Sequence, residues 1–407
     1  MDKTRLRNYA RLIAEVGGNI QKGEEVWIRA GLEQPDFIAM LVEECYKLGA
    51  KRVVVDWDYQ PLAKIANKYA SVSELAKVTP YALARLKYRV KKLPTMIYIE
   101  SEDPDGLKGM NQKKMAKASK RRYPRVKPFI DAMDDKYKWA IAAVPGLKWA
   151  KKVFPKLNDE DAVEALWEAI LETSRANGNG IENWKKHNDF LAKQCKKLND
   201  LHLDYLHYTS KRGTDFKVWM IEDAIWIGGG EYLEDKRFFN PNIPSEESFI
   251  SPMKGKAEGT LVATKPLSYN GNLIENFSIT FKDGKVVSVK AEKGQNVLEE
   301  MVKMDEGASM LGEVALVPDD SPISNSGLLF YNTLFDENAA CHVALGRGFG
   351  TSIIDSYKYS LKELQDKGIN ESMIHVDFMI GSKDLDIVGY TKNGGKVQIF
   401  KNGNWAI

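Results

Sequence analysis

The 407 residues of this chain exceed the usual size of one hydrophobic core, so about two or three domains are expected. Apolar residues make up 43% and charged residues 28%, an ordinary globular mix, and the formal net charge of +3 argues against a dedicated nucleic-acid binder. Three widely spaced cysteines argue against a disulfide framework, and no apolar segment resembles a signal core or a membrane span, so we expect a cytoplasmic protein without a membrane anchor.

The first half of the sequence alternates between short apolar segments and amphipathic ones. Strands are expected at 24–30, 51–57, 95–101 and 138–145, and helices at 4–18, 35–50, 158–176 and 182–198. This alternation is typical of a parallel sheet covered by helices on both faces. We therefore predict an α/β fold with an N-terminal parallel-sheet α/β domain over 1–205. No glycine-rich phosphate-binding motif follows any of these strands.

A run of basic residues without an acidic one, KKMAKASKRRYPRVK, occupies 113–127. One interpretation is a phosphate-binding patch, which would make the chain a phosphate or nucleotide binder. The missing glycine-rich loop and the near balance of the overall charge argue against it. We favour a solvated helix that is followed by a loop broken by Pro124.

The second half of the sequence, after about residue 203, is rich in strands. Two strands flank a turn in 203–221, and the segment 276–292 has the pattern of a hairpin centred on Asp283-Gly284. Further strands are expected at 259–266, 312–318 and 373–381, and a helix at 296–304. We predict a C-terminal β-rich α+β domain over 206–407.

Several acids and imidazoles of this half have no obvious structural purpose. On a strand, His375 and Asp377 point to the same face, either as a chelating pair or as a histidine that hydrogen-bonds its neighbour. Glu313 begins an otherwise apolar strand, and Glu246 and Glu247 lie between two prolines. Each of these glutamates, taken alone, is also consistent with a surface carboxylate.

The segment TLFDENAACHVALGRGFG, at 333–350, places Glu337 five residues before His342. These two side chains converge only if the chain turns between them, since they diverge on a regular helix or strand. Cys341 would then point away from His342, and we interpret it as a small buried residue. Mixed sets of carboxylates and imidazoles without thiolates suit hard or borderline divalent ions, so we predict that the C-terminal domain binds metal.

Four segments, PSEESFISP, GEVALVP, TLFDENAACHVALG and HVDFMIG, resemble in this order the metal-binding segments of the thermophilic aminopeptidase family. RGTDFKV is similar as well, and the resemblance extends over nearly the whole chain. It implies a metal-dependent aminopeptidase that releases N-terminal residues from peptides with a free N-terminus, through a water activated by two divalent ions. We expect Zn, Co or Mn. The family also implies a homodimer whose active site faces an internal cavity.

The resemblance assigns the ligands by position. One ion is expected on Glu247, Glu313 and His342, and a second on His375 and Asp377 with Glu313 bridging, while Glu337 is a further carboxylate at the metals. Either Glu313 or Glu337 is expected to relay a proton to the leaving amine.

One residue departs from the family pattern. Family members typically carry a tyrosine where this chain has Phe349. A phenol donates a hydrogen bond to a developing oxyanion, and a phenyl ring does not. The alternative interpretation is therefore a catalytically impaired, metal-containing peptide-binding protein.

Overall fold

The computed structural model describes residues 1–407, and its internal contacts divide the chain into two compact units. The first unit comprises 1–186 and 230–244, and the second comprises 187–229 and 245–407. The domain assignment of 1–205 and 206–407 stays a prediction. None of the helices combines the length and the hydropathy that crossing a membrane requires.

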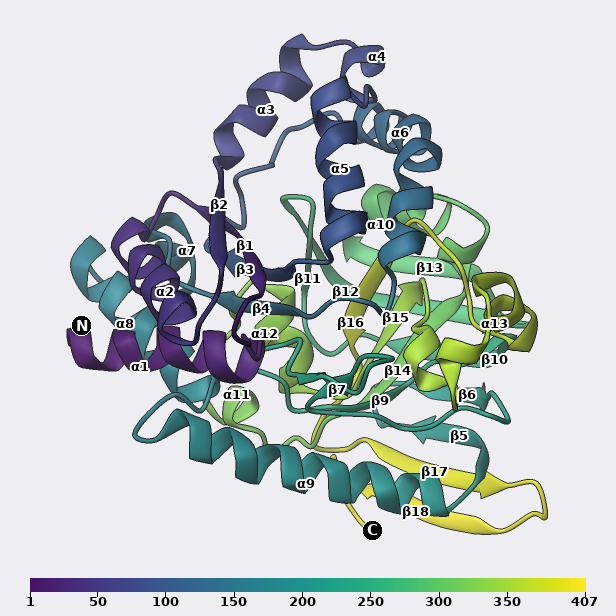
Figure 1. Ribbon diagram of the computed structural model, residues 1–407. Helices are drawn as coiled ribbons and strands as arrows, with labels where there is room; N and C mark the ends of the chain where they lie inside the picture. The colour runs from purple at the N-terminus through teal and green to yellow at the C-terminus, as the bar shows by residue number, and fades with distance from the viewer. The chain divides into compact units, whose positions relative to one another are not determined.

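The first unit is built on a four-stranded parallel sheet in the order β2-β1-β3-β4 (Figure 1). Its strands are β1 (Glu25–Gly31), β2 (Arg52–Asp58), β3 (Thr95–Glu100) and β4 (Trp139–Ala143), with a small hairpin of β7 (Glu231–Tyr232) and β8 (Phe238–Phe239). Its helices are α1 (Lys3–Leu12), α2 (Pro35–Lys47), α3 (Gln60–Tyr69), α4 (Val72–Leu75), α5 (Pro80–Lys92), α6 (Gln112–Met133), α7 (Leu147–Val153) and α8 (Asp159–Thr173). The parallel α/β architecture is as predicted.

Two parts of this unit differ from the sequence-based expectation. The loop expected at Pro124 is wrong, because α6 continues through Pro124 and Pro128 for 22 residues. Each proline removes one backbone donor, but α6 keeps its other turns and is flanked by α5 along part of its length. Helices α3, α4 and α5 lie in a segment for which no element was predicted.

The second unit contains two antiparallel sheets, and helix α9 (Gly180–Asp200) enters it from the first unit. The larger sheet has nine strands in the order β11-β12-β10-β6-β5-β17-β18-β19, with β13 beside β12. These strands are β5 (Leu203–Thr209), β6 (Asp215–Met220), β10 (Pro252–Val262), β11 (Leu267–Tyr269), β12 (Asn272–Lys282), β13 (Lys285–Lys293), β17 (Asp386–Thr391), β18 (Lys396–Lys401) and β19 (Asn404–Trp405). The hairpin predicted at Asp283-Gly284 is confirmed, with φ of 51° and 72° at these residues, as a type I′ turn requires.

The smaller sheet has the order β16-β15-β14-β9. Its strands are β9 (Ser248–Ile250), β14 (Leu311–Leu316), β15 (His342–Gly346) and β16 (His375–Met379). Helices α10 (Gln295–Val302), α11 (Pro322–Asn325), α12 (Thr333–Asp336) and α13 (Leu361–Lys367) complete the unit.

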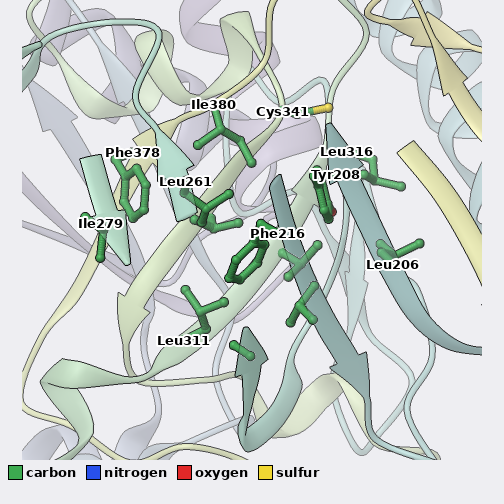
Figure 2. Packing of buried hydrophobic residues seen from close by; sticks show 14 of the residues in the cluster. Leu206, Tyr208, Phe216, Leu261, Ile279, Leu311, Leu316, Cys341, Phe378 and Ile380 are labelled. Carbon is green, nitrogen blue, oxygen red and sulfur yellow. The ribbon is translucent and has the colours of Figure 1, made fainter. Parts of the chain in front are cut away.

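One face of the smaller sheet packs into the core of the second unit. Figure 2 shows Leu311 and Phe378 of the smaller sheet in the same cluster as Phe216 and Leu261 of the larger one. All four side chains are at most 4% exposed. Because strand side chains alternate, this packing leaves the opposite face of the smaller sheet for other residues.

Candidate metal centre

The face of the smaller sheet that is turned away from the core carries acids and imidazoles. In register, Glu313 of β14 lies beside Ala344 of β15, and Ala344 lies beside Asp377 of β16. Residues paired across neighbouring strands point to the same face, so two carboxylates flank a methyl group. His342 lies two residues before Ala344 on β15, and His375 lies two residues before Asp377 on β16. Because side chains two apart on a strand point the same way, both histidines share this face.

Together with Glu247, which directly precedes β9, these side chains form two groups that could hold a metal ion. They are Glu247 with Glu313 and His342, and Glu313 with His375 and Asp377. Within each group, the candidate ligand atoms lie within 4.8 Å of one another. Glu313 belongs to both groups.

The distances explain how one carboxylate joins the two groups. Nε2 of His342 lies 3.0 Å from Oε2 of Glu247 and 3.9 Å from Oε1 of Glu313. Nε2 of His375 lies 3.1 Å from Oε2 of Glu313 and 3.4 Å from Oδ1 of Asp377. The two oxygens of Glu313 therefore face different imidazoles.

Backbone carbonyls orient both imidazoles. Nδ1 of His342 lies 3.1 Å from the carbonyl oxygen of Ala340, and Nδ1 of His375 lies 2.7 Å from that of Arg347. A carbonyl only accepts hydrogen bonds, so each Nδ1 carries a hydrogen. In the neutral imidazole the lone pair is then on Nε2, the atom that faces the carboxylates, as in histidines that bind metals.

The donor set fits divalent cations. Oδ1 of Asp377 is buried and makes no hydrogen bond. Nε2 of His375 lies 3.4 Å from this oxygen without making a hydrogen bond to it. A buried carboxylate oxygen without a hydrogen bond is costly, and a cation beside it removes that cost. Carboxylate and imidazole donors without a thiolate suit zinc, cobalt and manganese.

Electrostatics in this cluster favour added positive charge. Burial raises the pKa of Glu313 to about 7. Burial, followed by the charge of Asp377, raises the pKa of Glu337 well above its usual range. Burial lowers the pKa of His342, but its hydrogen bond with Glu247 and the surrounding carboxylates outweigh burial and raise the pKa to about 10. Without a cation, this cluster therefore takes up protons.

Glu337 lies beside the cluster but in neither ligand group. The turn that the sequence required between Glu337 and His342 is present, because α12 passes into a 3₁₀ turn over Glu337–Ala339 before β15 begins. Cys341 is 1% exposed in the hydrophobic core, where Figure 2 shows its sulfur. This is the small buried residue that its position beside His342 predicted.

The adjacent glutamates before β9 have different surroundings. Glu247 faces His342, whereas Oε2 of Glu246 lies 3.7 Å from Nε2 of His187. The backbone N–H of Glu246 donates to Oδ1 of Asn338 over 2.7 Å. Asn338 is fully buried, and this hydrogen bond connects the segment before β9 to the segment after α12. Sequence reasoning connected Asn338 only with the turn after Glu337 and not with this contact, for which the available signal was an amide among acids.

Gly312 is a second positioning residue that sequence reasoning missed. It lies in the irregular pairing of β14 just before Glu313. A Cβ atom at Gly312 would lie 2.2 Å from the carbonyl oxygen of Arg347, the oxygen that accepts from His375. The missing side chain lets β14 approach the carbonyl that orients this imidazole. In the sequence, the available signal for this close approach was a glycine directly before Glu313, the only acid of the strand.

Phe349 packs directly on a candidate ligand. Its ring centroid lies 4.8 Å from that of His375 and 5.7 Å from that of Phe249. Its backbone N–H donates to Oγ of Ser251 over 2.8 Å. The residue that departs from the family pattern therefore lies beside the cluster.

Known proteins match this chain from end to end. A family model described as thermophilic metalloprotease (M29) matches residues 2–405. Aminopeptidase AmpS of Bacillus subtilis (strain 168) is 41% identical over 406 residues, 99% of this chain and 98% of the relative. The solved structure of wild-type AmpT from Thermus thermophilus has a TM-score of 0.89 at 35% identity, covering 100% of both chains. These matches confirm the resemblance found in the sequence, and the chain belongs to the thermophilic metalloprotease (M29) family.

Proposed function

We propose that this chain releases N-terminal residues from peptides with two divalent ions bound in the cluster described above. The proposed ligands are Glu247, Glu313 and His342 for one ion, and Glu313, His375 and Asp377 for the other. The chain is a metal-dependent aminopeptidase, since its family is one of metalloproteases and the relatives that match it end to end are aminopeptidases. Those relatives give no support to the catalytically impaired alternative. The position of Glu313 between two imidazoles carries the proposal of a shared ligand.

Divalent ions in such a site lower the pKa of bound water toward about 7 and polarise the carbonyl to be attacked. Glu313 is occupied on both oxygens, so we assign the proton transfer to Glu337. Glu337 is buried beside the cluster and belongs to neither ligand group, so its carboxylate is free to take a proton from the attacking water. Glu337 then gives this proton to the nitrogen of the leaving amine.

The charge of the cluster supports an exopeptidase. Four carboxylates, those of Glu247, Glu313, Glu337 and Asp377, balance two divalent ions, so a positively charged substrate amine meets no net repulsion. A carboxylate that accepts from this amine contributes about 1.5–3 kcal/mol. Acetylation of the amine should therefore slow cleavage roughly 10- to 150-fold.

A paired time course on one short peptide, with and without an N-terminal acetyl group, tests the direction of cleavage by mass spectrometry. We expect stepwise loss of single N-terminal residues from the free peptide and almost none from the acetylated one. Equal rates, or early internal fragments, would show an endopeptidase instead.

Metal analysis of the purified chain tests the shared ligand separately. We expect two ions per chain in the natural sequence and one in Asp377→Asn. Glu246→Gln is the matched control, since Glu246 is the buried neighbour of Glu247 but lies near His187, and it should keep both ions. A single ion in the natural sequence would contradict the bridging role of Glu313.

Three finer properties are also proposed, of which the homodimer rests on the family resemblance. The bound metal is zinc, cobalt or manganese, which elemental analysis of the enzyme from its native cells would identify. The chain forms a homodimer, which sedimentation equilibrium would test. It acts in the cytoplasm, which cell fractionation would test.

A further inference from the structure

The parallel sheet of the first unit has two unlike faces. On one face of β1, Val26, Ile28 and Ala30 are at most 2% exposed. Trp27 and Arg29 alternate with them and point to the other face. Parallel sheets are normally covered on both faces by apolar side chains, so packing alone does not account for a polar, aromatic face.

A cavity of about 530 Å³ lies over this second face. In register, Trp27 lies beside Met96, and Arg29 lies beside both Asp56 and Tyr98, so strands β1, β2 and β3 form its floor. Residues of α5 and α6 form its walls. All of these elements belong to the first unit.

The cavity carries positive charge that the protein does not neutralise. Two of its four arginines, Arg29 and Arg85, form ion pairs with aspartates of β2. The other two, Arg89 and Arg122, have no carboxylate partner. Nε of Arg89 is buried without a hydrogen-bond partner, and Arg122 donates through Nη1 to the carbonyl oxygen of Lys77 over 3.0 Å. Two guanidinium groups are thus left for an anion.

The cavity also offers flat surfaces. The guanidinium of Arg85 lies 5.0 Å from the ring of Trp27 and 5.7 Å from that of Tyr81. Trp27 stacks on Tyr88 with 5.9 Å between ring centroids and 16° between planes. Trp27 is 7% exposed, and its Nε1–H is buried without an acceptor.

We propose that this cavity is a second binding site, for a small planar aromatic ring that carries an anionic group. Arg89 and Arg122 bind the phosphate or carboxylate, for which guanidinium groups are well shaped. The ring lies against the aromatic and guanidinium surfaces of the cavity. Arg122 belongs to the basic run 113–127, to which the peptidase activity gives no purpose. Because no glycine-rich loop is present, side chains make the contacts.

Titration calorimetry on the metal-loaded full chain tests the proposal with two aromatic anions, AMP and N-acetyltryptophan. Adenosine and inorganic phosphate serve as controls that carry only the ring or only the anion. We expect one site per chain for at least one aromatic anion, at least tenfold tighter than for either control. AMP as the tighter ligand indicates a nucleotide, and N-acetyltryptophan indicates an aromatic acid. If neither binds at least tenfold more tightly than both controls, the proposal is wrong.

Two arginine variants locate the bound anion. Arg122→Gln should weaken binding roughly tenfold or more, because it removes a charge-assisted contact. Arg125→Gln is the matched control, since Arg125 is exposed in the same helix and does not line the cavity, and its affinity should not change. Equal affinities of these variants would place the ligand elsewhere, for example at the metals, and overturn the proposal. If the melting curve of Arg122→Gln shows misfolding, Arg89→Gln replaces it and is judged in the same way. Aminopeptidase turnover should remain unchanged in all of these variants.

Discussion

Asn338→Ala should destabilise the second unit and loosen the metal centre together. Oδ1 of Asn338 accepts from the backbone N–H of Glu246 over 2.7 Å, and its Nδ2 donates to the carbonyl oxygen of Leu334 over 2.9 Å. The substitution leaves both backbone groups buried without this partner. Each unpaired buried group costs about 1–3 kcal/mol. Because water can partly replace the lost hydrogen bonds, we expect the free energy of unfolding to fall by about 2–4 kcal/mol.

For a unit of this size, that loss lowers the melting temperature by roughly 4–16 °C. Melting curves with and without added metal separate two contributions. The drop without metal reports the lost hydrogen bonds, and any additional drop with metal reports weaker binding through Glu247, which follows Glu246 in the chain. Asn325→Ala is the control, because Asn325 is exposed and its bond to Asp320 is on the surface, and it should change stability by less than about 0.5 kcal/mol. A metal-free Asn338→Ala protein that melts like this control would refute the reasoning.

Three other changes address the centre itself. His342→Ala and His375→Ala should each lose metal and turnover while the metal-free forms remain folded, and retention of metal with near-normal turnover in either would contradict the ligand assignment. A chelator should abolish peptide cleavage, and a divalent ion added to the same sample should restore it, whereas activity that survives complete metal removal would exclude metal-dependent hydrolysis. Phe349→Tyr should raise turnover by up to about a hundredfold, which is the effect of one hydrogen-bond donor to the oxyanion. An unchanged rate in a variant that binds its full metal content would show that another group is the donor.

Local patterns in the sequence predicted much of this structure because their causes are local. Strand alternation placed His375 and Asp377 on one face, and they do share a face of β16. The spacing of Glu337 and His342 required a turn, and one separates them. The Asp283-Gly284 pair specified its hairpin through backbone conformations available to few other residues.

The assembly of the centre, by contrast, depends on contacts between distant segments. Glu247 precedes β9 and Glu313 lies on β14, more than sixty residues apart, and only the sheet order brings them to His342. Periodicity does not encode strand order, so the resemblance alone joined these residues. The contact of Asn338 with Glu246 and the role of Gly312 were missed for the same reason, because their partners are remote amide and carbonyl groups.

The effect of Phe349 depends on its neighbours in the structure. Compared with the tyrosine typical of the family, it lacks a hydroxyl group. In the structure its ring packs against His375 and Phe249, a role that a phenyl ring and a phenol fill equally well. Nδ1 of His375 is already fixed by the carbonyl oxygen of Arg347, so the ring and this carbonyl together orient the imidazole. The change from tyrosine to phenylalanine therefore leaves the proposed metal ligands in place, and we expect any cost to fall on the stabilisation of the transition state.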